Sequence, residues 1–248
     1  RVPDPYYSDD HVTIYHGDTL DVLAELEISV DAVVTDPPYA SGSRLEAAKS
    51  SSGAMLRKTT ERNKQTRFGD RPIELDQMTT TGFVWLMRAV GSAVRPMLPD
   101  GGSILSFIDW RQWPNLVGAI ETCNYRVQGM IVWDKGSMGL GNGFRAQHEL
   151  VMHASKGVPT IHYKGCGNVI THRRVEPTDH PSPKPEQVMQ RLIEVVTAEQ
   201  GVVLDPFMGS GTTLRAAKNI GRQAIGIELE ERYCEIAAKR CAQEVLEL

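Results

Sequence analysis

The sequence predicts one α/β domain in which a mostly parallel sheet is covered by helices on both faces. Seven short apolar runs, rich in β-branched residues and bounded by turn residues, are typical of strands. Helical patterns separate several of these runs, and the chain contains no internal repeat. Strands that alternate with helices usually form a parallel sheet buried on both sides. A length of 248 residues suits one domain, or one domain with an inserted lobe.

The expected elements follow from periodicity and from helix-start and helix-stop residues. The expected strands are Val12–Tyr15, Asp31–Thr35, Ser103–Ile108, Gln128–Trp133, Glu149–His153, Val202–Asp205 and Ala224–Glu228. Each expected helix has apolar residues at helical spacing, a proline in its first turn, or a glycine at its end. The expected helices are Gly82–Leu98, Pro185–Glu199, Thr212–Ile220 and Glu231–Val245.

Composition indicates an ordinary globular protein. Hydrophobic residues make up 41% and charged residues 23%, and the formal net charge is −4. No apolar run reaches the roughly 18–20 residues that a membrane helix requires, and the first ten residues lack the apolar core of a signal peptide. We therefore expect a soluble cytoplasmic protein without membrane contact. No C-x-x-C occurs, so neither a disulfide framework nor a zinc ribbon is expected.

Basic charge is concentrated in one segment. Between Arg44 and Arg71, eight basic residues face three acidic ones, and residues 40–76 show no sustained apolar period. A long aperiodic segment inside a compact domain is commonly functional or disordered. A second aperiodic stretch, residues 156–183, contains Arg173 and Arg174. Both stretches suit contact with a phosphate-bearing partner, although a solvated loop is the alternative interpretation.

The first chemical motif is Asp36-Pro37-Pro38-Tyr39, which follows the expected strand Asp31–Thr35. Ligands of open parallel sheets bind beyond the carboxyl ends of the strands, so this tetrapeptide lies where chemistry is expected. The two prolines stiffen the backbone. A carboxylate and a carbonyl can accept two N–H hydrogens, and a tyrosine ring can stack on a planar base. The motif therefore favours a site for an amino-bearing ring over a simple turn.

The second motif is a glycine loop between a strand and a helix. The loop contains Gly209 and Gly211, and the following helix begins near Thr212. A helix N-terminus presents free N–H groups and positive dipole to a ligand. Glu228 ends the next expected strand, near the offset at which an acidic residue reaches ribose hydroxyls. The pattern therefore predicts a nucleoside-bearing cofactor.

A dinucleotide site is the obvious competitor for this loop. Leu214 occupies the position of the third glycine of G-x-G-x-x-G, which argues against a nicotinamide cofactor. The loop also lacks the G-K-[ST] ending of a P-loop.

Together, the two motifs resemble the S-adenosylmethionine-dependent amino-methyltransferases of DNA. The catalytic motif precedes the cofactor loop, which resembles the permuted β-group of that family. The resemblance covers most of residues 6–248, with residues 40–76 outside it. Further similar elements are His16–Leu20, Ile131–Lys135, Phe144–Glu149 and His180–Pro185. The resemblance implies a single Rossmann-like methyltransferase domain with a seven-stranded, mostly parallel sheet, a basic insertion at 40–76 and a short target-recognition region at 156–183.

The resemblance also implies residue roles. Glu228 would bind the ribose hydroxyls, Asp18 and Thr19 would lie at the adenine side, and Lys184 would face the carboxylate end of S-adenosylmethionine. The cofactor residues implied are Asp18, Thr19, Asp36, Lys184, Asp205, Phe207, Gly209, Ser210, Gly211, Thr212, Glu228 and Leu229. The catalytic residues implied are Asp36, Pro37, Pro38 and Tyr39. The expected DNA contacts are Arg57, Lys58, Arg62, Lys64, Arg67, Arg173 and Arg174.

The implied activity is methylation of the N6 amine of an adenine flipped out of double-stranded DNA. Cytosine-N4 methylation is the alternative, and RNA or protein acceptors or a catalytically silent binding module are further ones. Cytosine-C5 chemistry is not expected, because no Pro-Cys pair occurs. The group includes dimers and enzymes with a cognate restriction enzyme, so both are candidate partners.

The remaining residue types predict no further site. His148 and His153 lie five residues apart and span the expected strand Glu149–His153, so they face opposite sides and we expect no metal. The four cysteines are expected to pack or to lie on the surface without a role. The four tryptophans are expected to be packing residues; they are Trp85, Trp110, Trp113 and Trp133.

Overall fold

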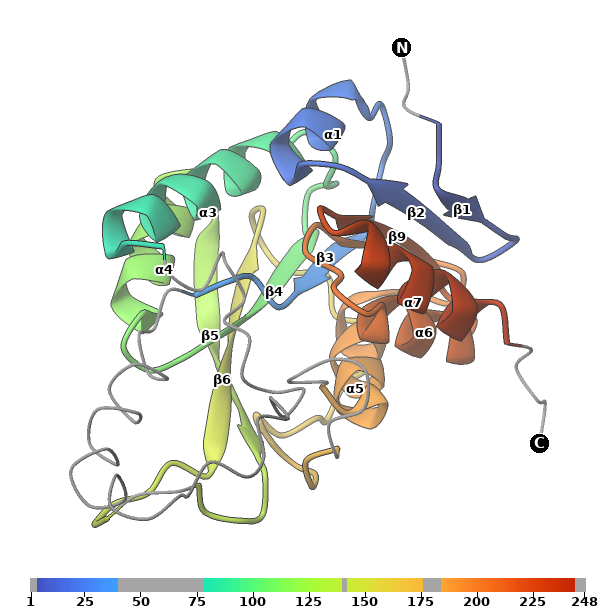
Figure 1. Ribbon diagram of the computed structural model, residues 1–248. Coiled ribbons are helices and arrows are strands. Elements are labelled where there is room, and N and C mark those ends of the chain that lie inside the picture. The colour runs from blue at the N-terminus through green and yellow to red at the C-terminus, as the bar shows by residue number, and fades with distance from the viewer. Residues whose placement is uncertain (1–3, 40–77, 140–141, 176–183, 244–248) are drawn as a thin grey trace, which may run out of the picture.

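The computed structural model describes residues 4–39, 78–139, 142–175 and 184–243, and their strands form one nine-stranded sheet (Figure 1). The strand order is β1-β2-β9-β8-β3-β4-β6-β5-β7. The strands are β1 Tyr7–Ser8, β2 Val12–His16, β3 Ala32–Thr35, β4 Ser103–Ile108, β5 Arg126–Asp134, β6 His148–Ser155, β7 Val169–Thr171, β8 Val202–Asp205 and β9 Gln223–Glu228.

The prediction of a mostly parallel α/β sheet is confirmed, but the predicted strand number is wrong. Five of the eight strand pairings are parallel, and β6 runs antiparallel to both of its neighbours. Seven strands were expected, and the sheet has nine in the described part of the chain. The two additional strands are the edge strands β1 and β7. They span two and three residues, which is too short for a periodic pattern to be visible.

Helices cover both faces of this sheet. On one face lie α1 (Thr19–Glu25), α3 (Thr80–Val94) and α4 (Trp113–Glu121). On the other face lie α5 (Glu186–Val196), α6 (Thr212–Asn219) and α7 (Glu231–Cys241). The sequence did not predict α1 or α4, which are short and depend on their N-terminal residues. Asp18 caps α1, and α4 has a proline in its first turn.

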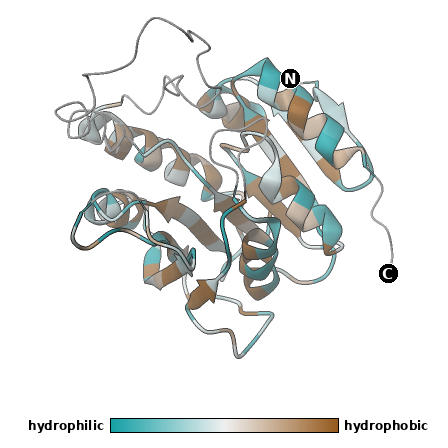
Figure 2. Ribbon diagram, turned by 60° about the horizontal axis from the view of Figure 1, so that its bottom comes forward, coloured by the Kyte–Doolittle hydropathy of each residue, from teal (hydrophilic) through white to brown (hydrophobic). Residues whose placement is uncertain are grey.

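Two hydrophobic cores result from the alternation of side chains along the central strands. Val33 and Ile104 face the core under α1, α3 and α4, whereas Val34 and Phe107 face the core under α5 to α7. Figure 2 shows the hydrophobic strands enclosed between the helices. A fully buried side chain of this size contributes about 1.5–3 kcal/mol to folding. The sheet is therefore held from both sides.

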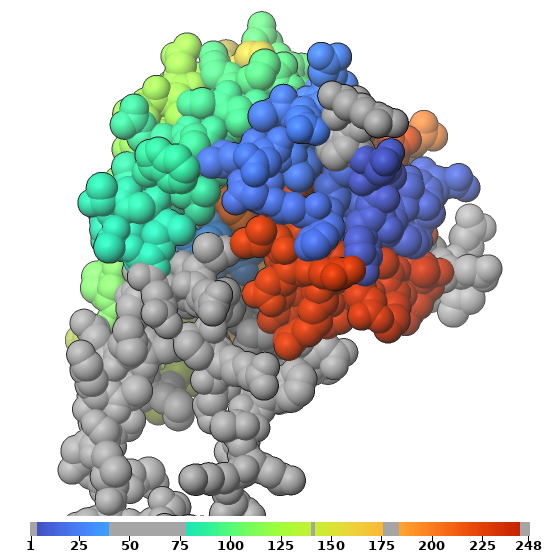
Figure 3. All heavy atoms as spheres, turned by 45° about the horizontal axis from the view of Figure 1, so that its top comes forward, coloured from blue at the N-terminus to red at the C-terminus, as the bar shows by residue number. Residues whose placement is uncertain are grey.

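Seven of the strands present their carboxyl ends at one edge of the sheet. These are β2, β3, β4, β5, β7, β8 and β9, as their pairings require. β2 pairs with β9, so residues near the two ends of the chain lie side by side (Figure 3). Ligand sites of α/β sheets lie at such an edge. We refer to it below as the carboxyl edge.

The buried carboxylate of Asp205 joins three elements at this edge. It accepts hydrogen bonds from the Thr35 hydroxyl at 2.6 Å, from the Thr213 hydroxyl at 2.5 Å and from the Phe207 amide at 3.1 Å. The residue is only 2% exposed, and burial raises its pKa to about 6. Asp205 therefore fixes the end of β3 to the end of β8 and to the first turn of α6.

Replacement of Asp205 by Asn should remove a pH dependence of stability. The folded-state pKa of about 6 lies above the unfolded value of 3.8, so Asp205 stabilises the fold most when protonated. Its stabilising contribution is full below about pH 4 and is lost as the pH rises to about 6. The free energy of unfolding of the wild type, minus that of Asp205→Asn, should fall by up to about 3 kcal/mol over this range. Urea unfolding of both proteins at several pH values measures this difference in unfolding free energy. A difference that does not change with pH would contradict the raised pKa of Asp205.

Candidate active site

The predicted catalytic segment lies directly beyond β3 at the carboxyl edge. The Asp36 side chain is 28% exposed, and both of its oxygens have donors. The Tyr39 hydroxyl donates to Oδ1 at 2.8 Å, and the Lys184 ammonium donates to Oδ2. The Tyr39 ring packs against both hydrophobic cores, and burial raises its pKa well above the ordinary value. Tyr39 is therefore a hydrogen-bond donor at neutral pH.

Lys184 belongs to a chain of four alternating charges, Asp36, Lys184, Glu149 and Lys135, which we call the charge chain. The Lys184 nitrogen lies 3.4 Å from Oε2 of Glu149, and the Lys135 nitrogen lies 2.5 Å from Oε1 of Glu149. The side chains of Lys184 and Lys135 are only 6% and 9% exposed. Their nitrogens lie 5.1 Å from the centroids of the Phe107 and Trp133 rings, respectively.

The electrostatics of the charge chain keep its interior members ionised. Burial opposes the charge of Lys184, but Asp36 and Glu149 hold its pKa well above the ordinary value. Burial also opposes the charge of Glu149, but Lys184 and Lys135 hold its pKa below the ordinary value. Buried ions persist when paired in this way. With two cations and two carboxylates, the charge chain is neutral overall.

The glycine loop lies beside the end of β9. The Gly209 amide donates to Oε2 of Glu228 at 3.0 Å, and the Glu230 amide donates to Oε1 at 2.8 Å. Gly211 has φ +78°, and a Cβ there would lie 2.7 Å from the Cβ of Ala237 in α7. Only glycine therefore allows this turn and the close approach of α6 to α7.

The Glu228 carboxylate has capacity for further hydrogen bonds, since a carboxylate can accept about four. Burial raises its pKa above the ordinary value. Asp18 and Thr19 lie at the start of α1, and the Thr19 hydroxyl donates to the Pro206 carbonyl at 2.7 Å. Leu229 is 48% exposed, and its carbonyl lies 3.0 Å from Nε2 of His16. The residues expected around a nucleoside thus come together from both ends of the chain.

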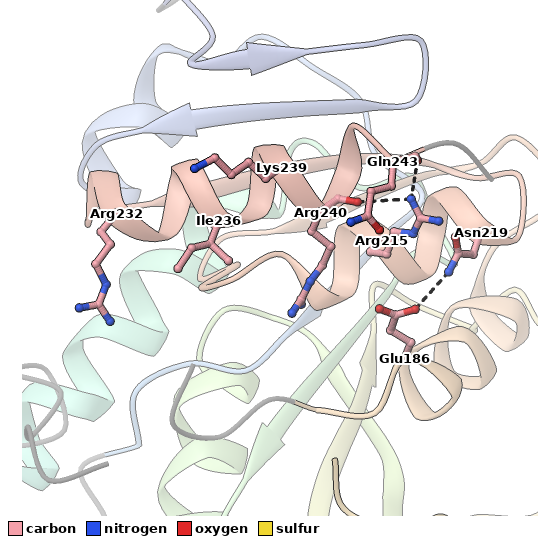
Figure 4. Close-up of a pocket in the computed structure, with 8 residues that line it drawn as sticks. All are labelled: Glu186, Arg215, Asn219, Arg232, Ile236, Lys239, Arg240 and Gln243. Atoms are coloured by element: carbon pink, nitrogen blue, oxygen red, sulfur yellow. Dashed lines mark hydrogen bonds between the residues drawn. The ribbon is translucent and has the colours of Figure 1, made fainter. Parts of the chain in front are cut away.

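A basic groove of about 650 Å³ lies between α6 and α7 (Figure 4). In Figure 4, Arg232, Ile236 and Arg240 extend from the same side of α7. Arg240 donates to the Thr212 hydroxyl at 2.8 Å and lies 3.5 Å from that of Ser210. This arginine therefore supports the glycine loop from the α7 side. The groove is lined by Glu186, Arg215, Asn219, Arg232, Ile236, Lys239, Arg240 and Gln243.

The structure brings most of the predicted site residues to the carboxyl edge. The predicted DNA contacts are only partly described. Arg173 and Arg174 are exposed and follow β7 at this edge. The predicted insertion at residues 40–76 and the last part of the predicted recognition region, 176–183, lie outside the described residues, as do Arg57, Lys58, Arg62, Lys64 and Arg67.

Sequence reasoning did not assign roles to five residues that contact the predicted site. Lys135 and Glu149 complete the charge chain, and their places at the ends of two family-like elements could have indicated them. Nothing in the sequence pattern indicates the tertiary contacts of the other three. These are Thr35, Thr213 and Arg240.

The tryptophan prediction is wrong for two of the four residues. Trp85 and Trp110 are each 63% exposed, whereas Trp133 is 2% exposed. Trp85 lies two residues from the buried Phe83 in α3, and this spacing turns it away from the core. Trp113 packs partly buried against the core, as expected.

Neither a metal-binding group nor a membrane-spanning helix occurs among the described residues. Within residues 4–39, 78–139, 142–175 and 184–243, no group of three or more His, Cys, Asp or Glu side chains could hold a metal ion. In the same ranges, no helix has the length and apolarity required to cross a membrane.

Comparison with known proteins agrees with this geometry. A family model described as DNA methylase, for N6 and N4 enzymes, matches residues 30–239. The chain is 30% identical to the putative methylase YubD of Escherichia coli K12, over 91% of this chain and 88% of that protein. It is 28% identical to the type II methyltransferase M2.DpnII of Streptococcus pneumoniae, over 97% of this chain and 93% of that protein.

Solved structures show the same fold. The M1.HpyAVI–SAM complex matches with a TM-score of 0.67 and 23% identity, over 94% of this chain and 100% of that one. The cytosine-N4-specific PvuII DNA methyltransferase matches with a TM-score of 0.73 and 18% identity, over 98% of this chain and 90% of that one. The Rossmann-like fold follows from these matches. Because the family model covers most of the sequence, the chain belongs to the N6/N4 DNA methylase family and is a DNA methyltransferase.

Proposed function

We propose that this protein transfers a methyl group from S-adenosylmethionine to the N6 amine of an adenine in double-stranded DNA. The observation that supports this most directly is the contact between Thr35 and Asp205. It places Asp36, the next residue after Thr35, beside the glycine loop that follows Asp205. An acceptor for an amine and a cradle for a nucleoside cofactor thus lie side by side at one edge of the sheet.

The residues present fit S-adenosylmethionine. Glu228 has acceptor capacity for the two ribose hydroxyls, and Leu229 offers an exposed apolar surface for the adenine. Asp18, Thr19, Phe207 and the loop from Gly209 to Thr212 would surround the rest of the molecule. When bound, this cofactor supplies an electrophilic methyl group on a sulfonium. The fold is shared with M1.HpyAVI, whose structure was solved as a SAM complex.

Asp36 and the Pro37 carbonyl would accept the two hydrogens of the target amine. Two accepted hydrogen bonds would draw the nitrogen lone pair out of conjugation with the ring. The nitrogen would then bond to the methyl carbon as the carbon–sulfur bond breaks, with S-adenosylhomocysteine as the leaving group and the surplus amine proton released to solvent. Tyr39 would stack on the base. Methyl transfer would be accelerated by the orientation of the amine toward the methyl group and by electrostatic stabilisation of the transition state. A base paired in a duplex must first be flipped out, at a cost of a few kcal/mol. No covalent bond between enzyme and base is required.

The choice of adenine rests on Asp36-Pro37-Pro38-Tyr39, the form of the motif that resembles adenine-N6 enzymes. Cytosine-N4 is the second candidate, because the PvuII enzyme named for that specificity has this fold with a TM-score of 0.73. Both bases present an exocyclic amine to the same acceptors. The identity of the methylated nucleoside distinguishes the two.

We propose that the exposed Arg173 and Arg174 contact DNA phosphates, because they follow β7 at the edge that carries Asp36. The basic segment at residues 40–76 would add further phosphate contacts. A DNA-modifying enzyme works where the DNA lies, and this supports the proposal of a cytoplasmic location. A homodimer and a cognate restriction enzyme remain predictions.

Replacement of Asp36 by Asn should lower methyl transfer to duplex DNA by about 100-fold or more, because the charge that polarises the amine is removed. Transfer of labelled methyl, followed by mass spectrometry of the nucleosides, measures rate and product together. The control is Asp100→Asn, whose side chain is 96% exposed and precedes β4 at the opposite edge.

Formation of N6-methyladenine by the wild type and its loss in Asp36→Asn support the proposal. N4-methylcytosine would overturn the base assignment and retain the role of Asp36. Full transfer by Asp36→Asn would contradict that role.

Replacement of Glu228 by Gln should weaken S-adenosylmethionine binding by about 10- to 100-fold, since hydrogen bonds to a charged acceptor contribute about 1.5–3 kcal/mol. Isothermal titration calorimetry without DNA measures the dissociation constant. Glu230→Gln is the matched control, because Glu230 is exposed and its hydrogen bond to Glu228 is made by the backbone amide, which this change keeps. Equal effects of the two changes would refute the ribose assignment.

A further inference from the structure

Oε2 of Glu149 is a buried acceptor without a hydrogen bond. Three buried side-chain nitrogen or oxygen atoms in the described part of the chain lack a hydrogen-bond partner, and this is the one carboxylate oxygen among them. Oε1 of the same carboxylate accepts a hydrogen bond from Lys135, so Glu149 lacks a hydrogen bond at one oxygen only. A buried charged oxygen without a hydrogen bond is costly and requires an explanation. The Lys184 ammonium forms an ion pair with this oxygen at 3.4 Å, but its hydrogen bond goes to Asp36.

The same ammonium neutralises the carboxylate that the proposed reaction uses to polarise the target amine. Oδ2 of Asp36 accepts from Lys184, and Oδ1 accepts from Tyr39. A carboxylate that is paired with an ammonium has little net charge to draw on the amine of a base. Asp36 therefore serves the target amine best after Lys184 has moved away.

We propose that Glu149 is a positioning residue that receives the Lys184 ammonium when the target amine binds to Asp36. This inference rests on the proposed function and identifies how its acceptor is made available. A lysine has a flexible stem, so rotation about its terminal bonds can close the 3.4 Å separation to a hydrogen bond. Oε2 then has its hydrogen bond, and the negative charge of Asp36 is available to polarise the amine.

Lys135 holds the Glu149 carboxylate in place. It lies 2.5 Å from the other carboxylate oxygen, Oε1, and its own side chain is 9% exposed. Glu149 is the second residue of β6 and pairs with Trp133 in β5, so its backbone is also held. The shift of Lys184 needs no proton uptake, because the charge chain stays neutral whichever carboxylate the ammonium contacts.

The test is Glu149→Gln, which keeps the size of the side chain and removes the charge that attracts Lys184. Single-turnover methyl transfer at saturating cofactor and DNA should slow by about 100-fold, as expected for a misplaced reacting group. The dissociation constants for S-adenosylmethionine and for duplex DNA should change less than about twofold. Glu149→Asp keeps the charge and should recover part of the rate, whereas a role in packing alone predicts no recovery.

A double-mutant cycle separates this role from a general loss of stability. In a Lys184→Gln background, Glu149→Gln should have little further effect on the single-turnover rate, because the ammonium that Glu149 would bind is absent. Asp134→Asn is the control: Asp134 ends β5 beside Lys135 and hydrogen-bonds the Gly136 amide and Gln147. It should leave the rate near that of the wild type.

Additive effects of Glu149→Gln and Lys184→Gln, or an unchanged rate in Glu149→Gln, would overturn the inference. Failure of the proposed function has a different signature, since the wild type itself would then not methylate DNA.

Discussion

The buried carboxylate of Asp205 is the constraint on which the arrangement of this site depends. Its three donors come from the last residue of β3, from the loop after β8 and from the first turn of α6. Thr35 and Asp36 are consecutive, so the contact with Thr35 sets the position of the proposed catalytic carboxylate. Thr213 follows the glycine loop, so the second contact sets the position of the proposed cofactor cradle. One side chain thus determines the spacing of two motifs that lie about 170 residues apart in sequence.

The charge chain of Asp36, Lys184, Glu149 and Lys135 is the second set of buried charges at this site. Buried ion pairs are weak contributors to stability, because desolvation offsets much of their attraction. The charge chain is therefore better explained by what it does to Asp36 than by its energy. It joins the proposed catalytic carboxylate to groups whose net charge of +1 balances that of Asp36, and it leaves one oxygen of Glu149 without a hydrogen bond. Such an arrangement allows charge to be redistributed inside a site without exchange of protons with solvent.

Much of the fold could be predicted from the sequence, because its central strands are apolar and end in recognisable motifs. β3 and β8 were expected with nearly their observed bounds, since Asp36 and the glycine loop mark where they stop. β1, β7, α1 and α4 were not expected. Two of these are too short to show a period, and the other two depend on an N-terminal cap or proline.

The sequence likewise identified some residues of the candidate site and did not indicate the contacts of others. Residues within motifs, such as Asp36 and Glu228, could be identified because their neighbours in sequence are also their neighbours in the site. The direction in which Lys184 points could not, because its partners Asp36 and Glu149 are 148 and 35 positions away, and only the folded sheet brings them together. Family resemblance located Glu149 in an element without indicating its contact.

The central claim, that Asp205 couples the two halves of the site, is tested most directly by Thr35→Val. This change removes one hydroxyl and alters neither Asp36 nor the glycine loop. The account predicts that both the affinity for S-adenosylmethionine, measured by calorimetry, and the single-turnover rate of methyl transfer to DNA fall together. A variant in which both quantities equal those of the wild type would show that the two motifs are positioned independently of Asp205, and would contradict the account.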